Sequence, residues 1–388
     1  MRDLGYFNTD SGPVDELAAL CAQNLDQAEV PLAVDIQRNV PIYDMRQLAP
    51  GLSDADARRV LMAEWARVLG QRSGVLVLKG AYADTAPIDR ATEAYTRIIA
   101  REKAVDGNSG DHFATAGAND RVWNSLQKLC LEDPEGFALY FGNPVIDAVC
   151  EAWLGPFYQM TAQINLVRPG GKAQSAHRDY HLGFQPAEVA ARFPAHVHIL
   201  SSVMTLQGAI AHCDMPLESG PTQLLPFSQQ VPGGYMAYRR PEIVAFFREH
   251  AVQLPLQKGD ALFFNPALYH AAGENVSRDI ARMANLVQVS SAFGRAMEAV
   301  DRHAMCRTLF PVLRELRASG RLDAAAIAAA ISAAAESYSF PTNLDSDPPA
   351  GGLAPETQAA LMARALAEGW ADSAFDTALD AHHARRRA

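Results

Sequence analysis

Hydrophobic and polar positions alternate with a period of two in the middle of the chain. Along residues 160–167 (MTAQINLV) apolar side chains occupy every second position, which places Gln163 and Asn165 on the same face as Val167. A strand with one apolar and one polar face is typical of a sheet that packs on a core and lines a hollow on its other side. We therefore expect a strand here that borders a ligand cavity.

Further strands are expected over most of residues 158–293, where short apolar runs are separated by turn residues. GVLVLKG at residues 74–80 reads as an earlier buried strand, and Gly80 closes it. These features predict an α+β protein built around an antiparallel sandwich. The other segments expected to form strands are residues 196–208 (HVHILSSVMTLQG), 222–227 (TQLLPF), 259–270 (GDALFFNPALYH) and 282–290 (RMANLVQVS).

Helical periodicity replaces alternation toward both ends of the chain. Residues 86–102 read as an amphipathic helix, and the alanine-rich run at 322–336 has high intrinsic helix propensity. The expected organisation is an N-terminal helical and extended region at 1–73, a β core at 74–294 and a C-terminal helical extension at 295–388. This extension either packs on the core or forms the interface of a homo-oligomer.

Composition excludes several classes of protein. The 388 residues are 49% hydrophobic and carry a formal net charge of −10, and the only arginine run is at residues 385–387. A nucleic-acid partner would need a basic surface, so none is expected. The five scattered cysteines fit buried thiols better than a disulfide framework. No leader or membrane-length apolar run is visible, so we expect a cytoplasmic protein with no membrane partner.

Candidate chemistry begins at His177-Arg178-Asp179, which is followed far downstream by His270. On an extended segment, residues two apart point the same way, so His177 and Asp179 can share a ligand. Two imidazoles and one carboxylate bind one face of an octahedral metal and leave the opposite face open, as in non-haem Fe(II) oxygenases. The alternatives are a solvated strand edge at 177–179 and a core histidine at 270.

Arg282 begins the strand at 282–290 and is expected on the same face as Ala284, Leu286 and Gln288. Burying an unpaired guanidinium is prohibitively costly, so such an arginine needs an anionic partner. A dicarboxylate cosubstrate would supply one, and a salt bridge to Asp279 or to another acid near the strand edge is the alternative. Arg278 is the competing arginine, but its loop predicts that it faces solvent.

The order of motifs resembles the phytanoyl-CoA dioxygenase family of Fe(II)/2-oxoglutarate oxygenases. The resemblance implies a double-stranded β-helix, or jelly roll, braced by N-terminal helices, with Fe(II), 2-oxoglutarate and O2 as cofactor and cosubstrates. It implies hydroxylation of an unactivated C–H bond of a small metabolite, with decarboxylation of 2-oxoglutarate to succinate and CO2. The segments that carry it are GVLVLKG at 74–80, INLVRPGG at 164–171, HRDYHLGF at 177–184, ESGPTQLLPFS at 218–228 and the run from 258 to 286.

Site roles carry over position by position from this resemblance. His177, Asp179 and His270 resemble the catalytic iron ligands, and Arg282 resembles the arginine that pairs with the distal carboxylate of 2-oxoglutarate. Two strand residues are expected to line the cosubstrate pocket. They are Gln163 and Asn165.

Substrate contacts are expected from a polar and aromatic segment before the core and from a residue beside the ligands. These candidates are His112, Arg121, Trp123 and Tyr180. Two other classes stay open: a zinc enzyme without redox chemistry, and a non-catalytic jelly-roll binding protein. Only the oxygenase should bind 2-oxoglutarate. His196, His198 and His212 lack an acid at ligand spacing and read as ordinary strand and loop histidines.

Overall fold

The protein is described by a computed structural model that covers residues 5–106, 119–349 and 351–387. The described strands are β1 (Asp35–Gln37), β2 (Val40–Asp44), β3 (Val75–Lys79), β4 (Asn119–Val122), β5 (Gln159–Val167), β6 (Thr205–Ala211), β7 (Gln223–Leu224), β8 (Ala261–Phe264), β9 (His270–Ala271) and β10 (Arg282–Ser290).

Eight of these strands form one mixed sheet in the order β1-β2-β3-β8-β6-β10-β5-β4. All neighbours are antiparallel except β2 and β3, which run parallel. The long strand β10 lies between β5 and β6, and it pairs Arg282 with Val167 and Gln288 with Gln207. The remaining strands, β7 and β9, form a separate two-stranded sheet. Strands far apart in sequence therefore meet at the centre of the large sheet.

Helices account for most of the remaining described residues. The α-helices are α1 (Val14–Cys21), α2 (Met45–Leu48), α3 (Ala55–Gln71), α4 (Ala86–Asp106), α5 (Ser125–Glu132), α6 (Pro134–Phe141), α7 (Pro144–Leu154), α8 (Ala187–Ala190), α9 (Ala195–Val203), α10 (Gly234–Ala237), α11 (Pro241–His250), α12 (Arg302–Ala318), α13 (Ala324–Ala334), α14 (Gln358–Glu368) and α15 (Asp372–Arg385). Short 3-10 turns are η1 (Gln27–Glu29), η2 (Ala49–Ser53), η3 (His181–Phe184), η4 (Leu217–Ser219) and η5 (Ser228–Gln230).

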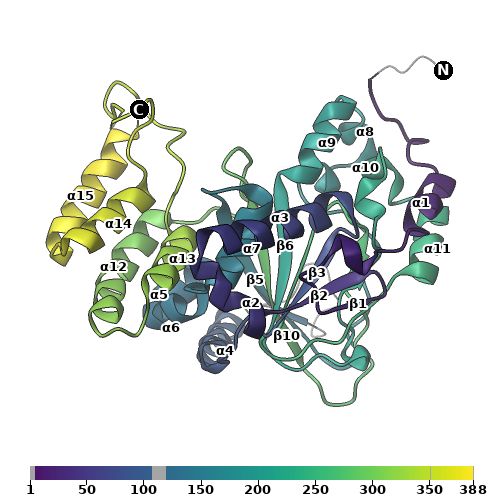
Figure 1. The fold of residues 1–388 in the computed structure, drawn as a ribbon, viewed down its shortest axis with the longest axis horizontal. Helices are drawn as coiled ribbons and strands as arrows, with labels where there is room; N and C mark the ends of the chain where they lie inside the picture. The colour runs from purple at the N-terminus through teal and green to yellow at the C-terminus, as the bar shows by residue number, and fades with distance from the viewer. Residues whose placement is uncertain (1–4, 107–118, 350, 388) are drawn as a thin grey trace.

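The main hydrophobic core lies between one face of the large sheet and the helices that cover it. Apolar residues of β5 such as Met160, Ala162 and Ile164 join side chains of α3 through α7 and of α12 in this core. The C-terminal helices α12–α15 lie at one end of the molecule, and α1 with α8–α11 lies at the other (Figure 1). The opposite face of the sheet is left to carry polar groups, as the alternation in β5 predicted.

Several predicted elements are confirmed, with the ends that the structure gives them. The segment 74–80 forms β3, residues 86–102 lie in α4, and the alanine-rich run forms α13. Asp323 caps α13 by accepting a hydrogen bond from the Ala326 amide at 2.8 Å. Small side chains on its buried face let α13 pack closely on α6 and α7, and both contacts are present.

The prediction of a strand over residues 196–208 is wrong in its first half. Residues from Ala195 to Val203 form helix α9, and only the following segment enters β6. The run of apolar and β-branched residues suggested a strand, yet Ile199 is 63% exposed while His198 is buried. The His198 imidazole is hydrogen-bonded to the Ala190 carbonyl at 3.0 Å, so tertiary contacts have overridden strand propensity here.

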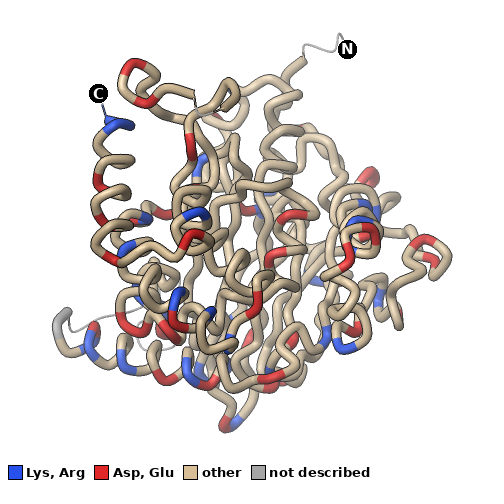
Figure 2. The backbone as a smooth tube through the Cα atoms, turned by 60° about the vertical axis from the view of Figure 1, so that its left-hand side comes forward, with Lys and Arg blue, Asp and Glu red and all other residues tan. Residues whose placement is uncertain are grey.

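Strands dominate residues 158–293 less than expected, because α8–α11 also lie within that range. The structure shows a mixed α+β protein with a large mixed sheet and many helices. The jelly roll remains a prediction from the family resemblance. Acidic and basic residues are interspersed along the backbone (Figure 2). Among the described helices, none combines the length and apolar character needed to cross a membrane.

Candidate metal centre

The backbone brings the two ligand segments side by side. An isolated antiparallel bridge joins His177 to His270. The His177 amide donates to the His270 carbonyl at 3.0 Å, and the His270 amide donates back at 3.2 Å. Two residues on, the Asp179 amide donates to the Pro266 carbonyl at 3.0 Å. This pairing holds His177 and Asp179 against the end of the strand segment that carries His270.

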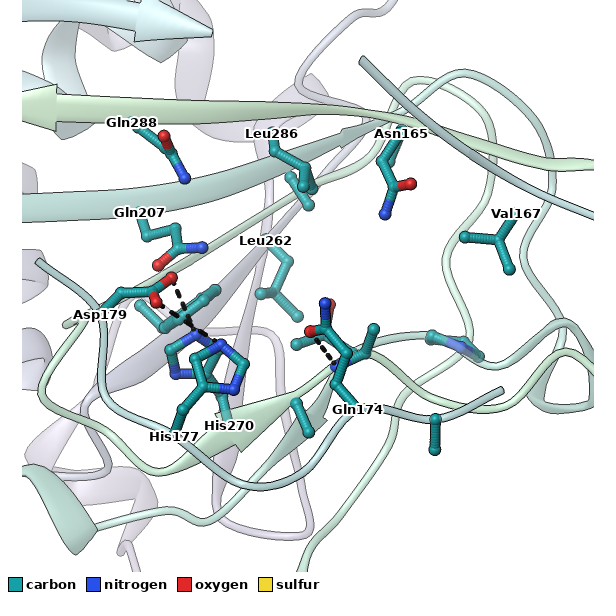
Figure 3. Close-up of a pocket in the computed structure, with 18 of the residues that line it drawn as sticks. Asn165, Val167, Gln174, His177, Asp179, Gln207, Leu262, His270, Leu286 and Gln288 are labelled. Atoms are coloured by element: carbon teal, nitrogen blue, oxygen red, sulfur yellow. Dashed lines mark hydrogen bonds and ion pairs between the residues drawn. The ribbon is translucent and has the colours of Figure 1, made fainter. Parts of the chain in front are cut away.

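The three side chains converge on one point, as Figure 3 shows. The His177 Nε2 lies 3.5 Å from one Asp179 carboxylate oxygen, and the His270 Nε2 lies 3.4 Å from the other. One ligand atom from each residue lies within 4.8 Å of the others. Among the described residues this is the one group of three or more histidine, cysteine or acidic side chains close enough to share a metal.

Hydrogen bonds to the backbone orient both imidazoles. The His177 Nδ1 lies 2.9 Å from the Ser175 carbonyl, and the His270 Nδ1 lies 2.8 Å from the Leu268 carbonyl. A carbonyl only accepts, so each Nδ1 carries a proton, which leaves the Nε2 atom of each ring as the one available to a metal. Such contacts are the usual outer support of metal-binding histidines. Both Nε2 atoms are directed toward Asp179.

The electrostatics favour an ionised Asp179 carboxylate and a neutral His177 imidazole, the protonation states that a cation needs. Burial by itself would raise the pKa of the Asp179 carboxyl, but the neighbouring His177 and His270, together with hydrogen bonding from Gln207, hold that pKa well below its ordinary value. Burial, followed by the proximity of His270, lowers the pKa of His177. An ionised carboxylate beside a neutral imidazole is a ligand set ready for a divalent metal.

Arg282 lies in the same pocket as the ligands. Only 6% of it is exposed, and its guanidinium donates to the Ser219 carbonyl at 3.3 Å. Burial lowers the pKa of Arg282 to about 10. Among the described residues it has no acidic partner, so the salt bridge to Asp279 that the sequence left open is not formed. Arg278 is exposed, as expected from its loop.

The pocket itself lies between the large sheet and the β7–β9 pair. Its cavity volume is about 640 Å³. Leu262 and Leu286 line it from the large sheet, and His270 and Ala271 line it from β9. Asn165 and Val167 lie toward one side of the view in Figure 3, and Asp179, Gln207 and Gln288 lie toward the other. The expected shared face of Arg282, Ala284, Leu286 and Gln288 is therefore confirmed, because all four line the cavity.

The other residues expected at the site fall into different places. Asn165 and Arg121 line the cavity, whereas Gln163 lies behind it and accepts a hydrogen bond from Arg121. Trp123 lies beneath the Arg121 guanidinium, 4.9 Å from it. Tyr180 is buried beside the pocket with a positive φ of 67° and does not line it. His112 falls outside the described residues.

One functional candidate, Gln207, was missed from the sequence. Gln207 in β6 lines the cavity and helps to lower the pKa of Asp179, and its position follows from cross-strand pairing with Gln288. Arg178 proves structural. It donates to the Ser228 carbonyl at 2.5 Å, and its guanidinium lies over the ring of Tyr269 at 4.7 Å. Successive residues of an extended segment point to opposite sides, so Arg178 points away from the side that His177 and Asp179 share.

Comparison with known proteins gives one family and several distant structures. A family model described as Phytanoyl-CoA dioxygenase (PhyH) matches residues 70–284. No curated protein sequence matches the chain. Among solved structures, the non-heme α-ketoglutarate-dependent epimerase SnoN from nogalamycin biosynthesis is similar at 20% identity and TM-score 0.42, covering 60% of this chain and 84% of its own.

Two further solved structures are similar to a comparable extent. The non-heme α-ketoglutarate-dependent carbocyclase SnoK, also from nogalamycin biosynthesis, has 19% identity and TM-score 0.45, covering 63% of this chain and 89% of its own. AviO1 from Streptomyces viridochromogenes has 18% identity and TM-score 0.43, covering 61% and 97%.

Proposed function

The chain belongs to the phytanoyl-CoA dioxygenase family, and from that premise we propose that it is an Fe(II)/2-oxoglutarate-dependent dioxygenase that hydroxylates an unactivated C–H bond of a small metabolite. The family uses Fe(II), 2-oxoglutarate and O2. The observation that carries the proposal is the coexistence, in one cavity, of the His177–Asp179–His270 group and a buried arginine that has no acidic partner among the described residues.

The side chains present fit the metal. Two neutral imidazoles and one carboxylate match the ligand preference of Fe(II) and cover one face of an octahedron. The open face would point into the cavity, because all three ligands line it. His177, Asp179 and His270 would hold the ion, and their backbone hydrogen bonds keep the Nε2 atoms aimed at it.

The side chains also fit a dicarboxylate. Arg282 offers charged N–H donors at the end of the cavity where it pairs with Val167. A carboxylate there would supply the anion that a desolvated guanidinium needs, and charge-assisted hydrogen bonds of this kind are the strong ones. Asn165 also lines the cavity in this region, and its side-chain amide offers N–H donors to such an anion.

The work divides between the cofactor and the chain. With 2-oxoglutarate and O2, bound Fe(II) supplies the oxidation that places a hydroxyl on carbon while 2-oxoglutarate becomes succinate and CO2. The protein orients the ligands, neutralises the distal carboxylate at Arg282 and encloses the reacting groups. Leu262 and Leu286 form apolar walls that restrict water near the centre.

Binding of 2-oxoglutarate to matched arginine variants tests the proposal. Isothermal calorimetry on Fe(II)-loaded protein without oxygen should show Arg282→Ala weakening 2-oxoglutarate binding by about 30-fold or more, because a buried charge-assisted contact is lost. Arg278→Ala is the matched control and should bind as the wild type does, since Arg278 is exposed outside the cavity. A zinc hydrolase or a binding module should ignore 2-oxoglutarate altogether, and that result would contradict the proposal.

A further inference from the structure

One polar side chain deep in the cavity is left without a role by the proposed iron and 2-oxoglutarate sites. Gln288 is only 4% exposed and lines the cavity, yet in the described part of the chain its Nε2 group has no hydrogen-bond partner. It pairs across the sheet with Gln207, whose amide helps to lower the pKa of Asp179, so it lies at the Asp179 end of the cavity (Figure 3).

This end is well separated from Arg282. The two residues lie six positions apart on the same face of β10, or about 20 Å along the strand at 3.3–3.4 Å per residue. An extended five-carbon diacid is shorter than this separation, so 2-oxoglutarate held between Arg282 and the metal does not extend along the strand as far as Gln288. The part of the cavity near Gln288 is therefore free for a second molecule when 2-oxoglutarate is bound.

The direction of the Gln288 amide is set by residues behind the cavity wall. Arg121 donates to the Gln163 Oε1 at 2.9 Å, and the Gln163 Nε2 donates to the Gln288 Oε1 at 3.1 Å. Arg121, Gln163 and Gln288 thus form a chain of hydrogen bonds, called the relay below. A guanidinium only donates, so the direction of donation along this relay is set by Arg121. Each amide must then accept on its oxygen and donate through its nitrogen. The relay ends with the Gln288 N–H groups facing the cavity.

We propose that the Gln288 amide binds a carbonyl or carboxylate oxygen of the primary substrate, with Arg121 and Gln163 acting as positioning residues that hold its N–H groups toward the cavity. This inference rests on the proposed function, since it assigns the Arg282 end to 2-oxoglutarate. The positive charge of Arg121 polarises the two amides that follow it in the relay. This polarisation strengthens the hydrogen bond that the Gln288 N–H groups can donate to an anionic oxygen. The substrate class is thus a small carboxylic acid or a carbonyl compound, and not an amine.

Two small probes of similar shape and opposite polarity test this assignment. Benzoate offers an anionic acceptor, and benzylamine offers only donors at neutral pH. Calorimetric titration of the Fe(II)- and 2-oxoglutarate-loaded protein without oxygen should show benzoate binding at least tenfold more tightly than benzylamine. Gln288→Leu should weaken benzoate about tenfold, as expected for one hydrogen bond to a charged group. Gln288→Glu keeps the shape, replaces the donor by a carboxylate and should invert the preference.

A separate measurement tests the positioning role of Arg121 and Gln163. Gln163→Met removes the link to Arg121 and frees the Gln288 amide to turn, so the preference for benzoate over benzylamine should fall severalfold while 2-oxoglutarate binding is unchanged. A general loss of structure would weaken 2-oxoglutarate binding as well, which separates it from a positioning role.

The outcomes distinguish this inference from the proposed function. If the wild type binds 2-oxoglutarate but not benzoate, or if Gln288→Leu binds benzoate within twofold of the wild type, the assignment of Gln288 is wrong and the proposed function stands. If Arg282→Ala rather than Gln288→Leu removes benzoate binding, the probe sits at the 2-oxoglutarate end and the assignment is again wrong. If the wild type binds no 2-oxoglutarate, the proposed function itself fails.

Discussion

Two sets of histidines in this protein differ in what their ring nitrogens contact: His212 by itself, and His177 together with His270. His212, which follows β6 and is 4% exposed, has both nitrogens engaged: Nδ1 lies 2.8 Å from the Thr92 hydroxyl and Nε2 lies 2.8 Å from the Tyr140 hydroxyl. His270 is equally buried, but its one backbone contact leaves Nε2 aimed at Asp179. Burial alone does not make a metal ligand. A buried histidine is a candidate metal ligand when one ring nitrogen has no backbone or hydroxyl partner and is directed toward a carboxylate.

The surroundings sharpen the contrast. The His212 ring packs against Tyr95 and Tyr140 among helices α4 and α6, where hydroxyl groups satisfy it completely. The His177 and His270 rings, 4.4 Å apart, border an open cavity. The first set stabilises the fold, and we propose that the second set binds iron. The predictions below separate these two roles.

The largest effect is expected from truncating a ligand. His270→Ala should weaken Fe(II) binding by more than about 100-fold, since loss of a direct ligand exceeds the 10- to 100-fold cost of losing an outer support. The melting temperature should change little. Equilibrium dialysis against Fe(II) without oxygen, with circular dichroism as the check on folding, measures both. Iron binding at wild-type affinity would remove His270 from the ligand set.

The reverse result is expected at the other histidine. His212→Leu should lower the free energy of unfolding by about 1–3 kcal/mol, because the Thr92 and Tyr140 hydroxyls each lose a buried hydrogen-bond partner. Fe(II) affinity should remain that of the wild type. Urea unfolding and iron titration of the same preparation give the two values. Iron loss in a folded His212→Leu protein would show that the two sets are coupled.

A smaller effect is expected from the residue that supports the carboxylate. Gln207→Leu removes the amide that helps to lower the pKa of Asp179 while keeping the side-chain volume near the cavity wall. Fe(II) affinity should fall about tenfold, at the lower end of what outer supports contribute. Dialysis against Fe(II) measures this fall. The matched control is Gln230→Leu, because Gln230 lies outside the cavity and should leave iron affinity unchanged.

The last prediction concerns the pH dependence of stability. Burial lowers the pKa of His212 to about 3, from an unfolded value of 6.5. Between these values the unfolded chain binds one more proton than the folded protein, so this stability is present above pH 6.5 and is lost as pH falls toward 3. The contribution to the slope is at most about 1.4 kcal/mol per pH unit. Chemical unfolding from pH 7 to 4 should therefore show a shallower slope in His212→Leu, and an identical slope would contradict the burial argument.

Much of the site could be predicted from sequence because its signals are local. In the structure His177 and Asp179 both line the cavity, as their two-residue spacing predicted. Alternate residues of β10 line it as well. Gln207 could not be found this way, since its position opposite Gln288 depends on the register between β6 and β10. Helix α9 was missed because its apolar residues suggested a strand, whereas its buried face carries His198 and Ser201. The roles of the site residues remain predictions.

The most direct test of the central claim is an optical titration of Fe(II)-loaded protein with 2-oxoglutarate in the absence of oxygen. We predict a visible metal-to-ligand charge-transfer band that saturates at about one 2-oxoglutarate per iron, because the open face of the His177–Asp179–His270 set admits a bidentate keto acid. A folded, iron-loaded protein that develops no such band would contradict the account.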